Sequence, residues 1–81
     1  MKLNETCELM VSNDYKDRFK AEYYQLDNRI EGLHKMLIKY QDGTLKFSPV
    51  CSYDLLNSQL KIMELYRGIL EERAVKEEVE L

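Results

Sequence analysis

A heptad seam constrains this chain more than any other feature. Over three repeats, large apolar or aromatic residues recur in steps of 4, 3, 4, 3, 4 and 3, at Phe19, Tyr23, Leu26, Ile30, Leu33, Leu37 and Tyr40. This spacing places all of them on one stripe of an α-helix and is typical of a helix that packs lengthwise on another. Tyr15 extends the seam by one step, while Tyr24 and Ile38 fall on a different side.

Capping residues indicate where the first long helix begins and ends. The run Ser12–Asp14 offers three consecutive side-chain oxygens that can accept hydrogen bonds from free amides at a helix start. Gly43 can adopt the left-handed conformation that ends a helix. The sequence therefore predicts an N-terminal arm over residues 1–12, with at most a short helical turn, and a helix over about 14–41.

A linker and a second helix follow within the same hairpin domain, 13–81. Pro49 disfavours helical backbone at the residue before it, so residues 42–52 are predicted to be an extended linker. Ser52 is a suitable N-cap for a second helix over about 53–78. A linker of this length makes the two helices antiparallel neighbours.

The second helix has a wider apolar face than one partner helix can cover. Its apolar positions occupy about half of the helical wheel and are Leu55, Leu56, Leu60, Ile62, Met63, Tyr66, Ile69, Leu70 and Ala74. An isolated hairpin would leave part of this face in water. The predicted fold class is therefore all-α, an antiparallel two-helix hairpin with a short N-terminal arm or helix that self-associates into a helical oligomer.

Composition excludes several classes of function. The chain has 81 residues and a net charge of −3, whereas binding to DNA or RNA polymers is typical of a basic surface. No apolar run approaches the length of a membrane span, and the first residues do not resemble a secretory signal. These features predict a cytoplasmic location without a membrane partner.

The sequence offers little catalytic or metal-binding chemistry. His34 is the only histidine and lies beside the seam, which favours a partly exposed helix residue over a catalytic one. Cys7 and Cys51 lack the spacing of a zinc site and are interpreted as reduced thiols, with a disulfide between them as the alternative. We expect no catalytic residue, no metal and no cofactor, and hence no enzyme.

Aromatic residues beside cations are the best candidates for ligand binding, because a ring stacks on a nucleobase while a cation binds its phosphate. Tyr15 precedes Arg18 by about one helical turn, and Arg73 follows Tyr66 by one heptad. Arg73 lies on an otherwise apolar face and needs a partner there, either a carboxylate of another subunit or a ligand phosphate.

The linker supplies two further candidates. Lys46 and Ser48 flank Phe47 between the two helix-breaking positions, and the linker is longer than a plain hairpin turn requires. These residues could cover a ligand at an intersubunit site or simply pack on a neighbour. The linker is therefore interpreted as a connector, with a lid as the additional hypothesis.

Two segments of the chain carry a family resemblance. They read DYKDRFKAEYYQLDNRIEGLHKML and GTLKFSPVCSYDLLNSQLKIMELYRGILEERA. Together they resemble very small proteins of phages and prophages of gut bacteria, including crAss-like phages. The hairpin is more distantly similar to phage anti-CBASS and anti-Thoeris sponge proteins, which are oligomeric helical hairpins that sequester cyclic nucleotide immune signals without cleaving them.

That resemblance implies a binding site and a function. Leu60, Tyr66 and Arg73 correspond to an apolar residue, an aromatic residue and an arginine at the same spacings in sponge proteins, and Tyr15 and Arg18 roughly correspond to an aromatic and a basic residue. The implied function is sequestration of cyclic di- or trinucleotides at subunit interfaces. The alternatives are a protein–protein inhibitor or adaptor of the anti-CRISPR kind, and a structural phage oligomer without a ligand.

Overall fold

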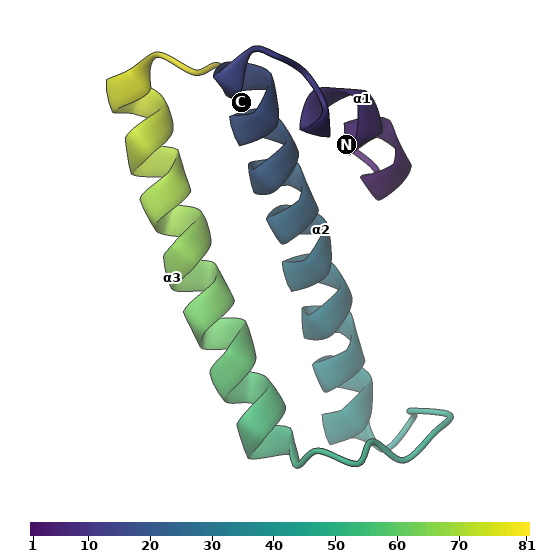
Figure 1. Cartoon of the computed structure of the whole chain (residues 1–81). Helices are drawn as coiled ribbons and strands as arrows, with labels where there is room; N and C mark the ends of the chain where they lie inside the picture. Colours follow the sequence, from purple (N-terminus) through teal and green to yellow (C-terminus); the bar gives the residue numbers. More distant parts are fainter.

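Two long antiparallel helices form the body of the molecule (Figure 1). In the computed structural model, which describes all 81 residues, α2 spans Tyr15–Asp42 and α3 spans Tyr53–Glu77. A short arm precedes them and holds the 3-10 helix η1 (Leu3–Thr6) and the single turn α1 (Cys7–Met10). The chain contains no strand, which confirms the all-α prediction. Neither long helix carries a stretch apolar enough to cross a membrane.

Side-chain and backbone caps hold the ends of the long helices. The Asp14 carboxylate accepts a hydrogen bond from the Lys16 amide at 3.0 Å, and the Ser52 hydroxyl accepts one from the Leu55 amide at 3.2 Å. Gly43 ends α2 in the left-handed conformation, with φ of 75°. Glu78 ends α3 in the same conformation, with φ of 57°, although a side chain disfavours it.

Gly43→Ala should lower the free energy of unfolding by about 1–2 kcal/mol, because a Cβ makes the left-handed conformation unfavourable. Gly32→Ala is the matched control: Gly32 lies inside α2, and an added Cβ would meet nothing within 4 Å. That variant should gain up to about 1 kcal/mol from helix propensity. Urea denaturation of the two variants should give effects of opposite sign, and equal signs would contradict this description of the α2 cap.

The core lies along the line where α2 and α3 face each other. Both helices and the residue after the α3 cap contribute buried apolar side chains: Phe19, Leu26, Ile30, Leu37, Leu60, Leu70, Ala74 and Val79. Four of these belong to the heptad seam, so the seam spacing does place a continuous stripe against the second helix. Tyr23 and Leu33, also on the seam, are half-buried at its border.

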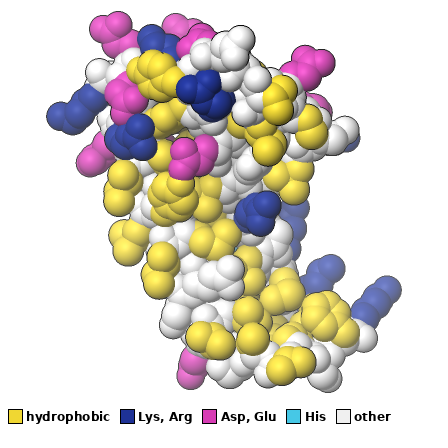
Figure 2. Space-filling view, in the orientation of Figure 1, with side chains coloured by type: hydrophobic (Ala, Val, Ile, Leu, Met, Phe, Trp, Pro, Cys, Tyr) yellow, Lys and Arg dark blue, Asp and Glu magenta, His cyan; other side chains and the backbone are white.

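A second apolar surface on α3 stays exposed. We call it the outer stripe, and it consists of Leu55, Ile62, Leu65, Tyr66 and Ile69. Ile62, Leu65 and Ile69 are 66%, 70% and 56% exposed, respectively. Figure 2 shows apolar side chains along the outer edge of α3 and over the linker end, while most charged side chains gather at the opposite end. Contiguous exposed apolar surface is typical of an interaction site.

Polar contacts cross-link α2 and α3 beside the core. Arg67 donates a hydrogen bond to the Asp27 carboxylate at 2.8 Å, and the Tyr23 hydroxyl donates one to the Glu71 carboxylate at 2.8 Å. Lys16 donates to the backbone carbonyl of Glu78 at 3.2 Å and so ties the start of α2 to the end of α3. These pairs fix the register of the two helices at half-exposed positions where apolar residues would face water.

The Tyr23 contact should make stability depend on alkaline pH. Burial and the hydrogen bond to Glu71 raise the pKa of Tyr23 from 10.0 to about 12. The folded state therefore keeps a proton that the unfolded state loses, so this contribution is fully present below pH 10 and declines as pH rises to about 12. Tyr23→Phe should flatten the fall of the urea midpoint over that range; an unchanged pH profile would contradict the contact.

Candidate functional site

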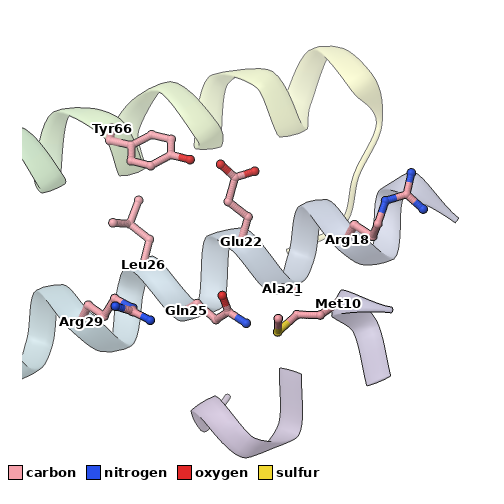
Figure 3. Close-up of a pocket in the computed structure, with 8 residues that line it drawn as sticks. All are labelled: Met10, Arg18, Ala21, Glu22, Gln25, Leu26, Arg29 and Tyr66. Atoms are coloured by element: carbon pink, nitrogen blue, oxygen red, sulfur yellow. The ribbon is translucent and has the colours of Figure 1, made fainter. Parts of the chain in front are cut away.

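A cleft lies between the arm, α2 and α3 (Figure 3). Its volume is about 340 Å³, at the lower end of the range of small-molecule sites. Residues from all three segments line it: Met10, Arg18, Ala21, Glu22, Gln25, Leu26, Arg29 and Tyr66. The cleft is shallow and largely open to solvent.

One polar face of α2 forms the wall of the cleft. Arg18, Glu22, Gln25 and Arg29 follow one another in steps of 4, 3 and 4, so they project from a sector of about 60° of the helix. The two arginines lie at the two ends of the cleft, with the acidic and amide side chains between them (Figure 3). Their Cα atoms are separated by eleven residues of helix, or about 16 Å.

The N-terminal arm forms a second wall because it packs along α2. Thr6 is fully buried, and its hydroxyl accepts a hydrogen bond from the Gln25 amide at 3.0 Å. The Arg18 guanidinium donates to the backbone carbonyl of Ser12 at 2.7 Å, which holds the turn between the arm and α2. Met10 consequently reaches the cleft from the arm (Figure 3).

The third wall is α3, which contributes Tyr66. Its ring borders the cleft, and its hydroxyl and the Glu22 carboxylate point toward each other across the opening (Figure 3). Tyr66 is 41% exposed and belongs to the outer stripe as well as to the cleft. No ion pair of the chain involves Glu22 or Arg29, so both charges are available to a ligand.

The residues predicted from sequence fall into two separate groups. Arg18 and Tyr66 line the cleft. Tyr15 is exposed at the first turn of α2, near the same end of the molecule. Lys46 and Ser48 lie in the linker at the opposite end of a molecule 43 Å long, so one chain cannot bring all of these residues to one ligand (Figure 1).

Arg73 is paired within its own chain. The expectation that it needs a partner outside its own chain is wrong, because its guanidinium donates to the Glu77 carboxylate one turn later at 2.8 Å. It also stacks over the Phe19 ring at 5.0 Å from the centroid. The hydrogen bond to Glu77 chiefly raises the pKa of Arg73, with a further contribution from the charge of Glu22. Its side chain is half-exposed, so it is also accessible from outside.

The linker builds a smaller pocket of its own. Its volume is about 230 Å³, and it is lined by Tyr40, Gly43, Leu45, Phe47, Ser48 and Pro49. Tyr40 stacks edge-on against Tyr53, with ring centroids 5.7 Å apart. No charged side chain lines this pocket, and it lies far from the cleft. The linker could therefore act as a lid only over the cleft of a second copy.

Three polar cleft residues were missed by the sequence reasoning, namely Glu22, Gln25 and Arg29. Together with Arg18 they recur at helical spacing, so the sequence does contain them as one polar stripe. Nothing in the sequence indicated that the arm would fold back along this stripe and make it one wall of a cavity. Cys7 and Cys51 are both exposed free thiols, and no cluster of three possible metal ligands occurs.

A protein-family model described as Sequestin matches residues 13–76, which is 64 of the 81 residues. The chain belongs to the Sequestin family. The Sequestin match includes nearly all of α2 and α3 and leaves out the arm, so Met10 reaches the cleft from outside the matched range. Searches of curated proteins and of solved structures found no match.

Proposed function

We propose that this protein is a phage-type anti-defence protein that sequesters cyclic di- or trinucleotide immune signals in the cytoplasm of a bacterial host, at interfaces between its own copies. Membership of the Sequestin family supports a sequestering role, since the family name denotes sequestration. The resemblance of the hairpin to phage sponge proteins supports the cyclic nucleotide as the ligand.

The observation that carries the proposal is the combination of one aromatic ring with two guanidinium groups around one cleft. The Tyr66 ring offers a face on which a nucleobase can stack, a contact that contributes about 1–3 kcal/mol. Arg29 has no partner in the chain and can bind a phosphate through two parallel hydrogen bonds. Arg18 can do the same with the donors that its contact to Ser12 leaves free.

Self-association would complete the site. The outer stripe runs along α3 and includes Tyr66, so a second copy that covers the stripe also lies beside the cleft. If two copies of α3 pack antiparallel across this stripe, the linker of one lies beside the end of α3 that carries Arg73 in the other. That arrangement brings Lys46 and Ser48 of the second copy toward Tyr15 and the upper cleft.

Sequestration of this kind involves no chemical step. The ligand is held by stacking, charge and exclusion from water, and it leaves unchanged when the protein unfolds. An enzyme would need a nucleophile, a base and a group that stabilises developing charge within one site. The side chains that line the cleft are assigned to binding alone.

Thermal unfolding with a panel of cyclic di- and trinucleotides tests the proposal. A ligand at one hundred times its dissociation constant should stabilise the native state by about 2.7 kcal/mol. For a domain of this size, that corresponds to an increase of roughly 10 °C or more in Tm. Arg29→Ala should abolish most of this shift, since it removes the cation that has no other partner.

Lys35→Ala is the matched control, because Lys35 is an exposed cation on α2 that lies outside the cleft. It should keep the full shift. If no member of the panel raises Tm, cyclic nucleotide sequestration is wrong, and binding of a protein partner through the outer stripe becomes the better explanation. If Arg29→Ala and Arg18→Ala both retain the shift, the ligand binds elsewhere.

A further inference from the structure

A carboxylate, that of Glu22, lies in the middle of the cleft. Glu22 lies between two arginines on the α2 wall, in a cleft assigned to a phosphate-bearing ligand. It forms no ion pair, and Arg73 on α3, whose pKa its charge helps to raise, is paired with Glu77. A free carboxylate at this position repels phosphate and lowers the affinity for any anion that offers it nothing in return.

A ligand overcomes this repulsion only if it presents hydrogen-bond donors to the carboxylate. An ionised carboxylate accepts and cannot donate, and its two oxygens can take two parallel N–H groups. Gln25 adds a further acceptor to the same wall. Its amide nitrogen donates to Thr6, which leaves its carbonyl oxygen for the cleft. The centre of the α2 wall therefore offers acceptors, while its two ends offer cations.

Among the four RNA bases, only guanine matches a carboxylate along its pairing edge with two adjacent donors. Its N1–H and its N2 amino group lie side by side and point in the same direction. Adenine places the lone pair of N1 beside its amino group, cytosine places the lone pair of N3 there, and uracil flanks its single donor with two carbonyl oxygens. Each of those bases would set an acceptor against the carboxylate, which is unfavourable.

The position of Tyr66 directs the edge of a stacked nucleobase toward Glu22. Tyr66 projects from α3 and Glu22 from α2, and the two face each other across the cleft (Figure 3). A base that stacks on the Tyr66 ring has its edge toward α2 and hence toward Glu22. We infer that the cleft selects cyclic nucleotides that contain guanine, with the Glu22 carboxylate accepting from N1–H and the N2 amino group. This inference rests on the proposed function and adds its base specificity.

Isothermal titration calorimetry of the whole protein with cyclic di-GMP, cyclic di-IMP and cyclic di-AMP tests the inference. Cyclic di-GMP should bind at least about 10-fold more tightly than cyclic di-AMP, since one matched bidentate contact gives roughly 10- to 100-fold discrimination. Cyclic di-IMP keeps N1–H but lacks the N2 amino group, so its affinity should be intermediate. Glu22→Gln should move the preference toward adenine, because an amide can donate to N1 of adenine and accept from its amino group.

Glu31→Gln is the matched control, since it removes an exposed carboxylate of α2 outside the cleft and should leave the order of affinities unchanged. Equal affinity of the unmodified protein for cyclic di-GMP and cyclic di-AMP would overturn the base assignment and leave sequestration intact. Retention of a guanine preference by Glu22→Gln would also overturn it. Failure of every cyclic nucleotide to bind would instead overturn the proposed function, and the inference with it.

Discussion

Leu70→Ala should lower the free energy of unfolding by about 3 kcal/mol, within the range of 2–5 kcal/mol that fully buried leucines lose on truncation. Leu70 is completely buried, and it belongs to the cluster that joins α2 to α3. The hairpin has only these two long helices, so the surroundings cannot close the cavity without moving one helix against the other. Total stability of a small domain is of the order of 5–15 kcal/mol, so this single change removes a large share of it.

Urea denaturation measures this effect, and Val75→Ala is its matched control. Val75 also lies on α3 but is 80% exposed, and it belongs to neither the core nor the outer stripe. Its truncation should change stability by no more than about 0.5 kcal/mol. If the two variants lose similar amounts, the assignment of the core face of α3 is wrong.

Ile62→Lys combined with Ile69→Lys should dissociate the oligomer while the hairpin stays folded. Both side chains are more than half exposed in a single chain, so the replacements cost the isolated hairpin little. In an interface built on the outer stripe, each lysine would bring an unpaired charge into an apolar contact, at a cost of several kcal/mol. The dissociation constant should therefore rise by at least about 100-fold.

Sedimentation velocity at micromolar concentration tests this prediction. The unmodified protein should sediment as an oligomer and the double variant as a monomer with unchanged helix content. Ile38→Lys is the control: it places a lysine at an exposed apolar position of α2, away from the outer stripe, and should keep the oligomer. A monomeric unmodified protein would contradict the proposal, as would a double variant that still assembles.

The same double variant separates two descriptions of the binding site. If the ligand binds at the interface, loss of assembly should weaken cyclic nucleotide binding even though every cleft residue of the chain is intact. If the monomer binds with full affinity, the cleft is sufficient by itself and the linker residues Lys46 and Ser48 take no part.

Much of the hairpin could be predicted because its determinants are local. The seam from Phe19 to Tyr40 has a period that only a helix satisfies. Gly43 ends α2 through its left-handed backbone, and Ser52 starts α3 as its N-cap. Such features act within a few residues of each other. These features can therefore be recognised in a single sequence.

The cleft could not be predicted because it depends on contacts between distant parts of the chain. The burial of Thr6 against Gln25 brings together residues nineteen apart, and no periodic pattern indicates it. The prediction that Arg73 needs a partner outside its own chain was wrong for a related reason. Its position on the wheel is apolar, but Glu77 and the Phe19 ring stabilise its charge at the rim of the core.

The linker and the cleft are far apart because the two helices between them are long. The helices hold the two ends of the hairpin apart, and the whole molecule extends over 43 Å. The sequence predicted that residues of both ends contribute to one intersubunit site, and a single chain cannot bring them together. The prediction of Lys46 and Ser48 as ligand-binding residues therefore depends entirely on a second copy.

Native mass spectrometry of the protein mixed with cyclic di- and trinucleotides tests sequestration most directly. One spectrum gives the mass of the assembly, the number of ligands it holds and, after denaturation, the mass of the released ligand. We expect an oligomer that carries a fixed number of cyclic nucleotides, each recovered with its original mass. An assembly that binds none of them, or one that releases linear or shortened products, would contradict it.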